Sequence, residues 1–252
     1  MLLFIGRFKD FHAGFLFISI GSALLLFTQI LIGSNILFVS ETWDVWSVIR
    51  NALYIKNGAP QFLNSDYFSR FPNNNGMLLL EAFLFSFFDL KYQRQVVFFG
   101  MIFQAVLSTL AGALMFLLVR EKTKNEKIAV LSWLLYFLLI GCSGWNTVFY
   151  TDMTGLVFPI FFLYLYSLKK KQEDMIKSVL LLICMIITVY IGYRIKPTIL
   201  IIAIASVMSE VLFKNKKVFL SLALSIVLVI PLSLLFSAAV DSTGLSLDKE
   251  KQ

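Results

Sequence analysis

Long uninterrupted apolar runs are the feature that most limits what this chain can fold into. The runs at about 13–33, 95–119 and 218–240 are each long enough to cross the ~30 Å hydrocarbon core of a bilayer as a helix. The chain is 59% hydrophobic and 15% charged, whereas soluble domains are usually ~45–50% apolar. Together with a mean hydropathy of +0.83, these runs predict an all-α polytopic membrane protein.

The scarcity of metal-binding side chains excludes several kinds of site. The chain has one His and two Cys, and His12, Cys142 and Cys184 are too few and too scattered for a zinc site, which needs about four N or S ligands. A disulfide framework is equally unsupported. The net charge of +7 can indicate nucleic-acid binding, but in membrane proteins basic residues mark cytoplasmic loops. We therefore expect no nucleic acid among the partners.

The positions of the cations select a topology. Three basic clusters follow apolar runs, at 120–127, 169–177 and 214–217. A fourth group, Arg7 and Lys9, precedes the first run. All four groups lie on the cytoplasmic face only if the apolar segment 77–90 does not cross the membrane.

Segment 77–90 is also short for a span of ~20 residues, and it contains Glu81 and Asp89. We therefore expect an interfacial or re-entrant helix there. The topology then has seven spans, with a cytoplasmic N-terminus and an external C-terminus. The expected spans are 13–33, 95–119, 128–145, 153–168, 178–193, 198–213 and 218–240. Residues 1–240 would form one transmembrane module, and 241–252 an external polar tail.

The first external loop, residues 34–94, is far longer than the others. Apolar residues recur at helical spacing in 41–57, and Gly58 and Pro60 follow, which predicts an amphipathic helix lying on the membrane. Asp44 falls in the first turn of that helix. It is either a carboxylate that stabilises the helix start or part of a catalytic site.

Segment 63–76, LNSDYFSRFPNNNG, is rich in turn-forming residues. Pro72 forces Phe71 out of the helical region, and Asn and Gly favour turns. The segment is either a hinge between two interfacial helices or a strip of polar side chains that hold sugar hydroxyls. The second interpretation gives four contact residues for an acceptor: Tyr67, Arg70, Asn73 and Asn74.

The second and third external loops add charged residues to the same face. Asp152, in the loop 144–154, either caps the next helix or joins Asp44 in a general-base site. Arg194 and Lys196, in the third loop, contradict the charge bias of the large clusters. They are either anchors that snorkel from the flanking helices or an anion site for a lipid-linked phosphate.

Four motifs occur in order on the expected outer face. ETWDVWSVIRNALYIKNG opens the long external loop, and YFSRFPNNNG, FYTDMTG and RIKPT follow it. Their order and sidedness resemble the GT-C superfamily of polytopic glycosyltransferases. The chain is most similar to the protein mannosyltransferase and aminoarabinose transferase branch, and to bacterial relatives with YF-x-R-[YF]-P-N-N and YTD motifs.

This resemblance implies an enzyme of the bacterial plasma membrane that moves a sugar from a polyprenyl-phosphate-type donor to an acceptor at the outer face. The acceptor would be a glycan, lipid or protein of the cell envelope. The resemblance implies that Asp44 is the catalytic acid, that Asp152 is the acid of the second external loop, and that Arg194 and Lys196 bind the donor phosphate. It leaves open whether a divalent metal takes part.

The sequence departs from the family pattern in three places. Mannosyltransferases have adjacent acids at the first site, whereas Glu41 and Asp44 are separated, and the Pro-Pro of the aminoarabinose branch is replaced by Phe71-Pro72-Asn73. Family members also continue past seven spans, so this chain would be a truncated product or one part of a split gene. Two alternatives to an enzyme are a transporter or lipid flippase fragment and a non-catalytic membrane assembly partner.

Overall fold

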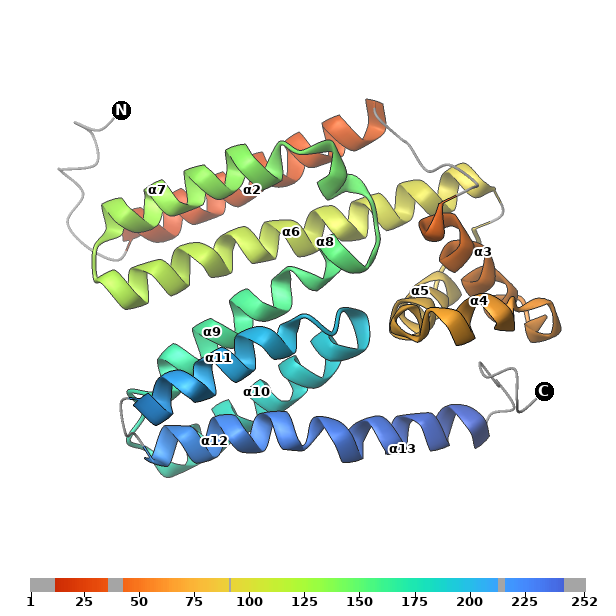
Figure 1. The fold of residues 1–252 in the computed structure, drawn as a ribbon. Helices are drawn as coiled ribbons and strands as arrows, with labels where there is room; N and C mark the ends of the chain where they lie inside the picture. The colour runs from red at the N-terminus through yellow and green to blue at the C-terminus, as the bar shows by residue number, and fades with distance from the viewer. Residues whose placement is uncertain (1–11, 36–42, 91, 213–215, 243–252) are drawn as a thin grey trace.

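The expected all-α class is confirmed. The computed structural model describes residues 12–35, 43–90, 92–212 and 216–242, and within these ranges the chain forms helices and turns with no strand. The longest helices run back and forth between two ends of the molecule (Figure 1). Glu41 and residues 243–252 of the expected tail lie outside the described ranges.

Five helical stretches are long and apolar enough to cross a membrane. They are Leu16–Asn35, Gln93–Thr123, Thr151–Lys169, Met175–Ile195 and Val218–Val240. The other two expected spans are shorter than predicted. One is α7 (Glu126–Tyr136) with a π-helical turn at Phe137–Gly141, and the other is α11 (Ile199–Leu212). An integral membrane fold is therefore clear, while the count of seven spans stays a prediction.

The helix α6 (Gln93–Thr123) is the central element of the bundle. Its 31 residues measure about 46 Å at ~1.5 Å per residue, so it extends beyond the ~30 Å hydrocarbon core. It packs against α2 (His12–Asn35), α7 and α9 (Val157–Lys169). Leu25, Phe116 and Trp133 are buried where α2, α6 and α7 meet.

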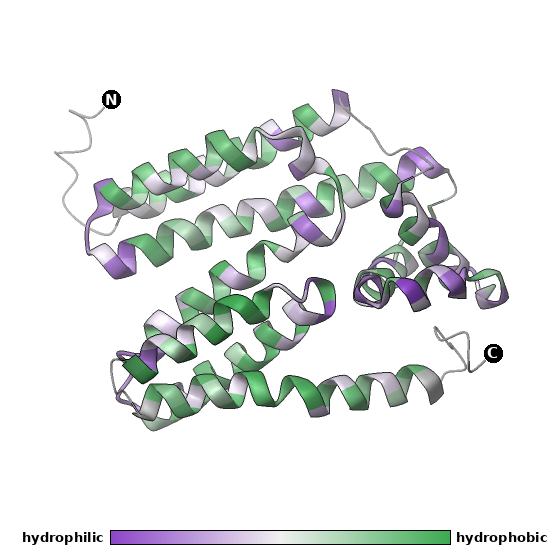
Figure 2. Cartoon of the chain, in the orientation of Figure 1, coloured by the Kyte–Doolittle hydropathy of each residue, from purple (hydrophilic) through white to green (hydrophobic). Residues whose placement is uncertain are grey.

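A second group of helices packs on the other side of α9. It consists of α10 (Met175–Ile195), α11, α12 (Lys216–Val227) and α13 (Val229–Ser242). Its core contains Phe162 of α9, Met185 of α10 and Ala203 of α11, all fully buried. The helices of both groups are hydrophobic along most of their length (Figure 2).

Two prolines explain where apolar helices break. Pro159 and Pro231 have no N–H to bond the carbonyl four residues earlier, and their rings crowd that carbonyl. Accordingly α8 (Thr151–Gly155) ends at the residue four before Pro159, and α12 ends four before Pro231. Each break lies within a continuous candidate span.

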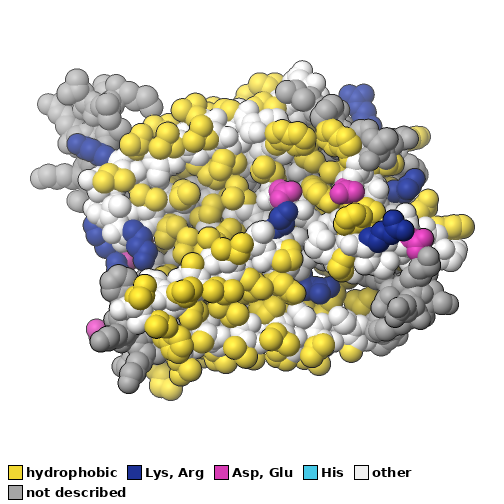
Figure 3. Space-filling view, in the orientation of Figure 1, with side chains coloured by type: hydrophobic (Ala, Val, Ile, Leu, Met, Phe, Trp, Pro, Cys, Tyr) yellow, Lys and Arg dark blue, Asp and Glu magenta, His cyan; other side chains and the backbone are white. Residues whose placement is uncertain are grey.

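One end of the bundle holds the first two basic clusters, as the topology requires. Lys171 Nζ lies 2.6 Å from Glu121 Oε1, and Lys124 Nζ lies 2.8 Å from Glu121 Oε2. Lys170 Nζ lies 2.7 Å from the fully buried Glu210, so this acid pairs with the second basic cluster. Figure 3 shows charged side chains towards both ends of this face, an acidic and a basic side chain together near its middle, and hydrophobic side chains over much of the remaining area.

The opposite end holds the short helices of the long external loop (Figure 1). They are α3 (Asp44–Lys56), α4 (Ser65–Arg70) and α5 (Asn75–Ser86), with 3-10 turns at Pro60–Phe62 and Pro72–Asn74. The amphipathic α3 is confirmed, and the chain leaves it through Gly58 at a φ of 67°, which glycine adopts easily. The 12 residues of α5 span about 18 Å, too short to cross a bilayer.

Glu81, on α5, is packed inside the protein. Its side chain is fully buried between α3 and α5, beside Met77, Leu78 and Phe85. Burial raises the pKa of the Glu81 carboxyl well above its ordinary value. The acid that argued against a membrane span is therefore part of the packed core that α3 and α5 form.

Candidate functional site

The three expected external loops meet at the end of the bundle opposite the basic clusters (Figure 1). Tyr150, ahead of α8, hydrogen-bonds to Asn74, ahead of α5. Lys196, after α10, forms an ion pair with Asp152 in the first turn of α8. The meeting of these loops was not visible in the sequence.

Gly76 allows the closest of these approaches. A Cβ at this position would collide with the backbone carbonyl oxygen of Arg194. Because a backbone carbonyl in a helix cannot move aside, only glycine lets the first turn of α5 pack directly on the end of α10. This contact fixes the first external loop against the third.

A tyrosine–asparagine–tyrosine network lies at the centre of the site. Asn74 is 1% exposed, and its Nδ2 donates to the Tyr67 hydroxyl at 2.7 Å. The Tyr150 hydroxyl donates to Asn74 Oδ1 at 3.3 Å, and Asn73 Nδ2 donates to the same oxygen at 3.1 Å. Asn74 therefore hydrogen-bonds to both tyrosines, while Asn73 is an exposed residue beside it.

Two further amides shape the segment that carries Tyr67. Asn51 Oδ1 accepts from the backbone N–H of Asn64 at 2.8 Å, and Asn64 Oδ1 accepts from the backbone N–H of Tyr67 at 3.1 Å. Asn64 is thus the N-cap of α4. The side-chain amides of Asn51 and Asn64 therefore position the backbone of this loop.

Both predicted acids act on the Tyr150 hydroxyl. Burial raises the pKa of Tyr150, and the negative charges of Asp44 and Asp152 raise it further. Burial, Tyr150 and Asp44 together raise the pKa of Tyr67. Both acids therefore act on the Tyr150 hydroxyl and Asp44 also acts on the Tyr67 hydroxyl, and both tyrosines stay neutral at physiological pH.

Asp152 is not the N-cap of the following helix. The N-cap position of α8 belongs to Tyr150, whose side chain makes no capping bond. Asp152 lies in the first turn, two residues after the N-cap, where an acid favours the helix dipole, and its exposed carboxylate pairs with Lys196. The ion pair joins a predicted catalytic acid to a predicted phosphate ligand.

The contacts of Arg194 and Lys196 separate two cations that the sequence grouped together. The Arg194 guanidinium lies over the Phe236 ring of α13, 4.2 Å from the ring centroid. Lys196 turns instead towards α8 and Asp152. Arg70 is exposed in the last turn of α4. Of the predicted basic ligands in the described ranges, Lys196 is the one that forms an ion pair with a predicted acid, Asp152.

Two features of this end escaped sequence analysis. Trp43 and Trp145 stack with ring centroids 5.8 Å apart, which joins the start of α3 to the second external loop. Tyr150 is inside the FYTDMTG motif, but only the fold shows that it contacts Asn74. The sequence signal for both was the density of aromatic residues in these loops.

A buried polar network below the site was also missed. Ser108 Oγ of α6 accepts from Gln29 Nε2 at 2.9 Å and from Asn146 Nδ2 at 2.6 Å, and lies 3.0 Å from the Tyr136 hydroxyl. Beside it, Thr154 donates to Gln104 at 2.9 Å. Because unbonded polar groups are costly in an apolar interior, this network fixes the second external loop onto α2, α6 and α7.

Comparison with known proteins places the chain in a family. Residues 7–250 match a family described as conserved hypothetical integral membrane protein. The chain belongs to this family. No curated protein and no solved structure matches it.

This integral membrane protein has an acidic and aromatic site at one end. Across the parts of the chain that the structure describes, no three His, Cys, Asp or Glu side chains gather as metal ligands. The site presents two carboxylates, an ammonium group and neutral phenol hydroxyls. Such a set can remove a proton from a hydroxyl and stabilise an anion next to it.

Proposed function

We propose that this protein is a glycosyltransferase that moves a sugar from a polyprenyl-phosphate-type lipid to an acceptor on the outer side of the membrane. The observation that carries the proposal is that Asp44 and Asp152 both act on the Tyr150 hydroxyl, while Asp152 also pairs with Lys196. These side chains come from three separate loops, so their convergence is a property of the fold. The order of motifs, similar to GT-C glycosyltransferases, supports the same function.

In the proposed reaction Asp44 is the general base. Its exposed carboxylate would accept the proton of an acceptor hydroxyl as the oxygen attacks the anomeric carbon. The bond from that carbon to the phosphate oxygen breaks, and the electron pair leaves with the lipid phosphate. The hydroxyl oxygens of Tyr150 and Tyr67, held neutral, can accept hydrogen bonds from the sugar.

Lys196 would stabilise the leaving phosphate. Electrostatic stabilisation of this kind is often worth ~3–4 kcal/mol per donor. Asp152 holds the ammonium group in place, so it acts as a positioning residue for Lys196. Nucleotide sugars are confined to the cytoplasm, so an external site needs a donor that arrives through the membrane.

A transfer assay with purified protein and a radiolabelled lipid-linked sugar tests this proposal. Asp44→Asn keeps size and polarity but cannot accept the proton, so turnover is expected to fall about 10²- to 10⁴-fold. Asp89→Asn removes an exposed acid beyond α5 and is the matched control. Near-normal turnover of Asp44→Asn in a correctly inserted protein would contradict the proposal and show that Asp44 only stabilises the start of α3.

The buried network around Ser108 favours one competing function, a transporter or lipid flippase fragment. Polar residues inside the membrane and broken helices are common in transporters. Such a protein would move a labelled lipid across proteoliposomes without transferring its sugar. A non-catalytic assembly partner would do neither, so the two assays together distinguish the three functions.

A further inference from the structure

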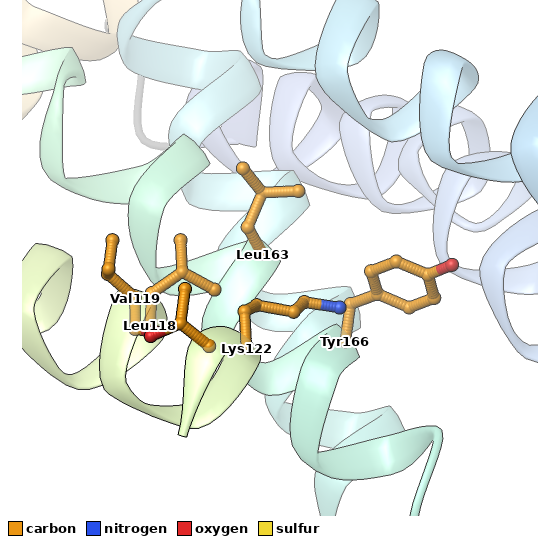
Figure 4. Close-up of a pocket in the computed structure, with 6 residues that line it drawn as sticks. Leu118, Val119, Lys122, Leu163 and Tyr166 are labelled. Carbon is orange, nitrogen blue, oxygen red and sulfur yellow. The ribbon is translucent and has the colours of Figure 1, made fainter. Parts of the chain in front are cut away.

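A groove lies at the basic end of the bundle, far from the candidate site. It has a volume of about 290 Å³ and is formed between α6 and α9 (Figure 4). Its lining residues are Leu118, Val119, Lys122, Thr123, Leu163 and Tyr166. No residue of the proposed active site takes part in it.

The groove changes from apolar to polar along both helices. Leu118 and Val119 lie one turn before Lys122 and Thr123 on α6, and Leu163 lies one turn before Tyr166 on α9. Figure 4 shows Lys122 and Tyr166 side by side, with the ammonium nitrogen 5.3 Å from the ring centroid. Since α6 ends at Thr123, the apolar wall lies on the bilayer side and the cation at the membrane surface.

Lys122 has no ion-pair partner in the described ranges, and the two acids whose charges act on it are paired with other lysines. Glu121 pairs with Lys124 and Lys171, and Glu210 pairs with Lys170. In the described ranges no ion pair involves Lys122, and its side chain is exposed. Segments 120–127 and 169–177 each contain four basic and two acidic residues, so the groove opens into a region of net positive charge.

We infer that this groove binds an anionic phospholipid of the surrounding leaflet. An acyl chain lies along Leu118, Val119 and Leu163, and the phosphate contacts Lys122. Basic pockets between transmembrane helices at a membrane surface recognise anionic headgroups in this way. A zwitterionic lipid carries its own cation next to the phosphate, which the basic clusters repel.

Lipid titration of the purified full-length protein tests the inference. Phosphatidylglycerol and phosphatidylcholine with identical acyl chains are compared by native mass spectrometry and by thermal unfolding. Lys122→Gln is expected to weaken phosphatidylglycerol binding about fivefold, the change that ~1 kcal/mol per basic side chain near an anionic lipid surface produces. Lys122→Arg keeps the charge and should retain binding, and Lys127→Gln, an exposed cation outside the groove, should behave as the wild type.

Two further measurements test the groove itself. Leu163→Trp fills the apolar part and should reduce binding of both lipids. Inorganic phosphate alone should give no comparable stabilisation. Equal binding of the two lipids, an equal loss in Lys127→Gln, or full protection by inorganic phosphate would overturn the inference. These readouts need no sugar transfer, so they succeed or fail independently of the proposed enzyme.

Discussion

Arg194 and Lys196 are two residues apart at the end of α10, yet their side chains reach different neighbours. Residues at i and i+2 do not share a helix face, so Arg194 turns to Phe236 and Lys196 to Asp152. The sequence showed two cations in one short loop and suggested one phosphate site. The structure gives each cation its own surroundings.

Replacing each cation should therefore have a different effect. Lys196→Ala should weaken donor-lipid binding about 10- to 100-fold, because a charge-assisted contact is worth ~1.5–3 kcal/mol. Arg194→Ala should mainly lower thermal stability through the lost cation–π contact. Donor affinity and melting temperature are measured in both variants. Unchanged lipid binding with a clear loss of stability in Lys196→Ala would identify Lys196 as a membrane anchor.

The raised pKa of Tyr67 predicts a pH dependence of stability. Below the ordinary tyrosine pKa of ~10, the hydroxyl is neutral in both the folded and the unfolded chain. As the pH rises past that value the unfolded chain ionises first, so the free energy of unfolding decreases. Unfolding followed between about pH 8 and 11 should show a weaker decrease in Tyr67→Phe than in the wild type. Tyr92→Phe, an exposed tyrosine at the same end, is the control, and equal curves for all three proteins would contradict the prediction.

At the scale of elements, the site depends on where short helices end and meet. The start of α5 lies against the last turn of α10, α8 begins directly after Tyr150, and α9 is separated from α8 by the break ahead of Pro159. These junctions place three loops within contact distance. The long helices connect the loops, but the junctions determine how the side chains of the candidate site are placed.

Gly76→Ala tests the closest junction. The added methyl group must push α5 away from the Arg194 carbonyl, and overpacking of this kind typically costs ~1–3 kcal/mol. We expect a lower melting temperature and reduced transfer activity. Gly144→Ala adds a methyl group where no atom lies within 4 Å and should leave both unchanged. A fully stable Gly76→Ala protein would contradict the packing of α5 on α10.

At the scale of the whole molecule, the two ends of the bundle have different chemistry. The basic clusters and the lipid groove lie at one end, and the acidic and aromatic site at the other. Because basic residues are retained in the cytoplasm, this polarity predicts a cytoplasmic groove and an external site. Neither sidedness nor span number follows from the helices alone.

Cysteine accessibility in intact cells tests the topology. In a background with Cys142 and Cys184 replaced by Ser, single cysteines at Asn73 and Tyr92 should both react with a membrane-impermeant reagent. Both positions are exposed and flank α5. A cysteine at the exposed Lys124 should react only after the membrane is opened. Opposite sidedness of positions 73 and 92 would mean that α5 crosses the membrane, and the external placement of Asp152 would be lost.

The sequence alone determined the all-α membrane class, the common end of the first two basic clusters, the amphipathic α3 and the non-spanning segment before α6. Each of these follows from periodicity, length or charge bias along a continuous stretch of chain, which neighbouring residues specify locally. Only the tertiary structure decided that Tyr150 hydrogen-bonds to Asn74 and that Lys196 pairs with Asp152 while Arg194 does not. It also decided that Ser108 accepts hydrogen bonds from the side-chain amides of Gln29 and Asn146. These contacts depend on how far each helix extends and how closely two backbones approach. A glycine such as Gly76 permits such an approach, but its partner is fixed only when the helices pack.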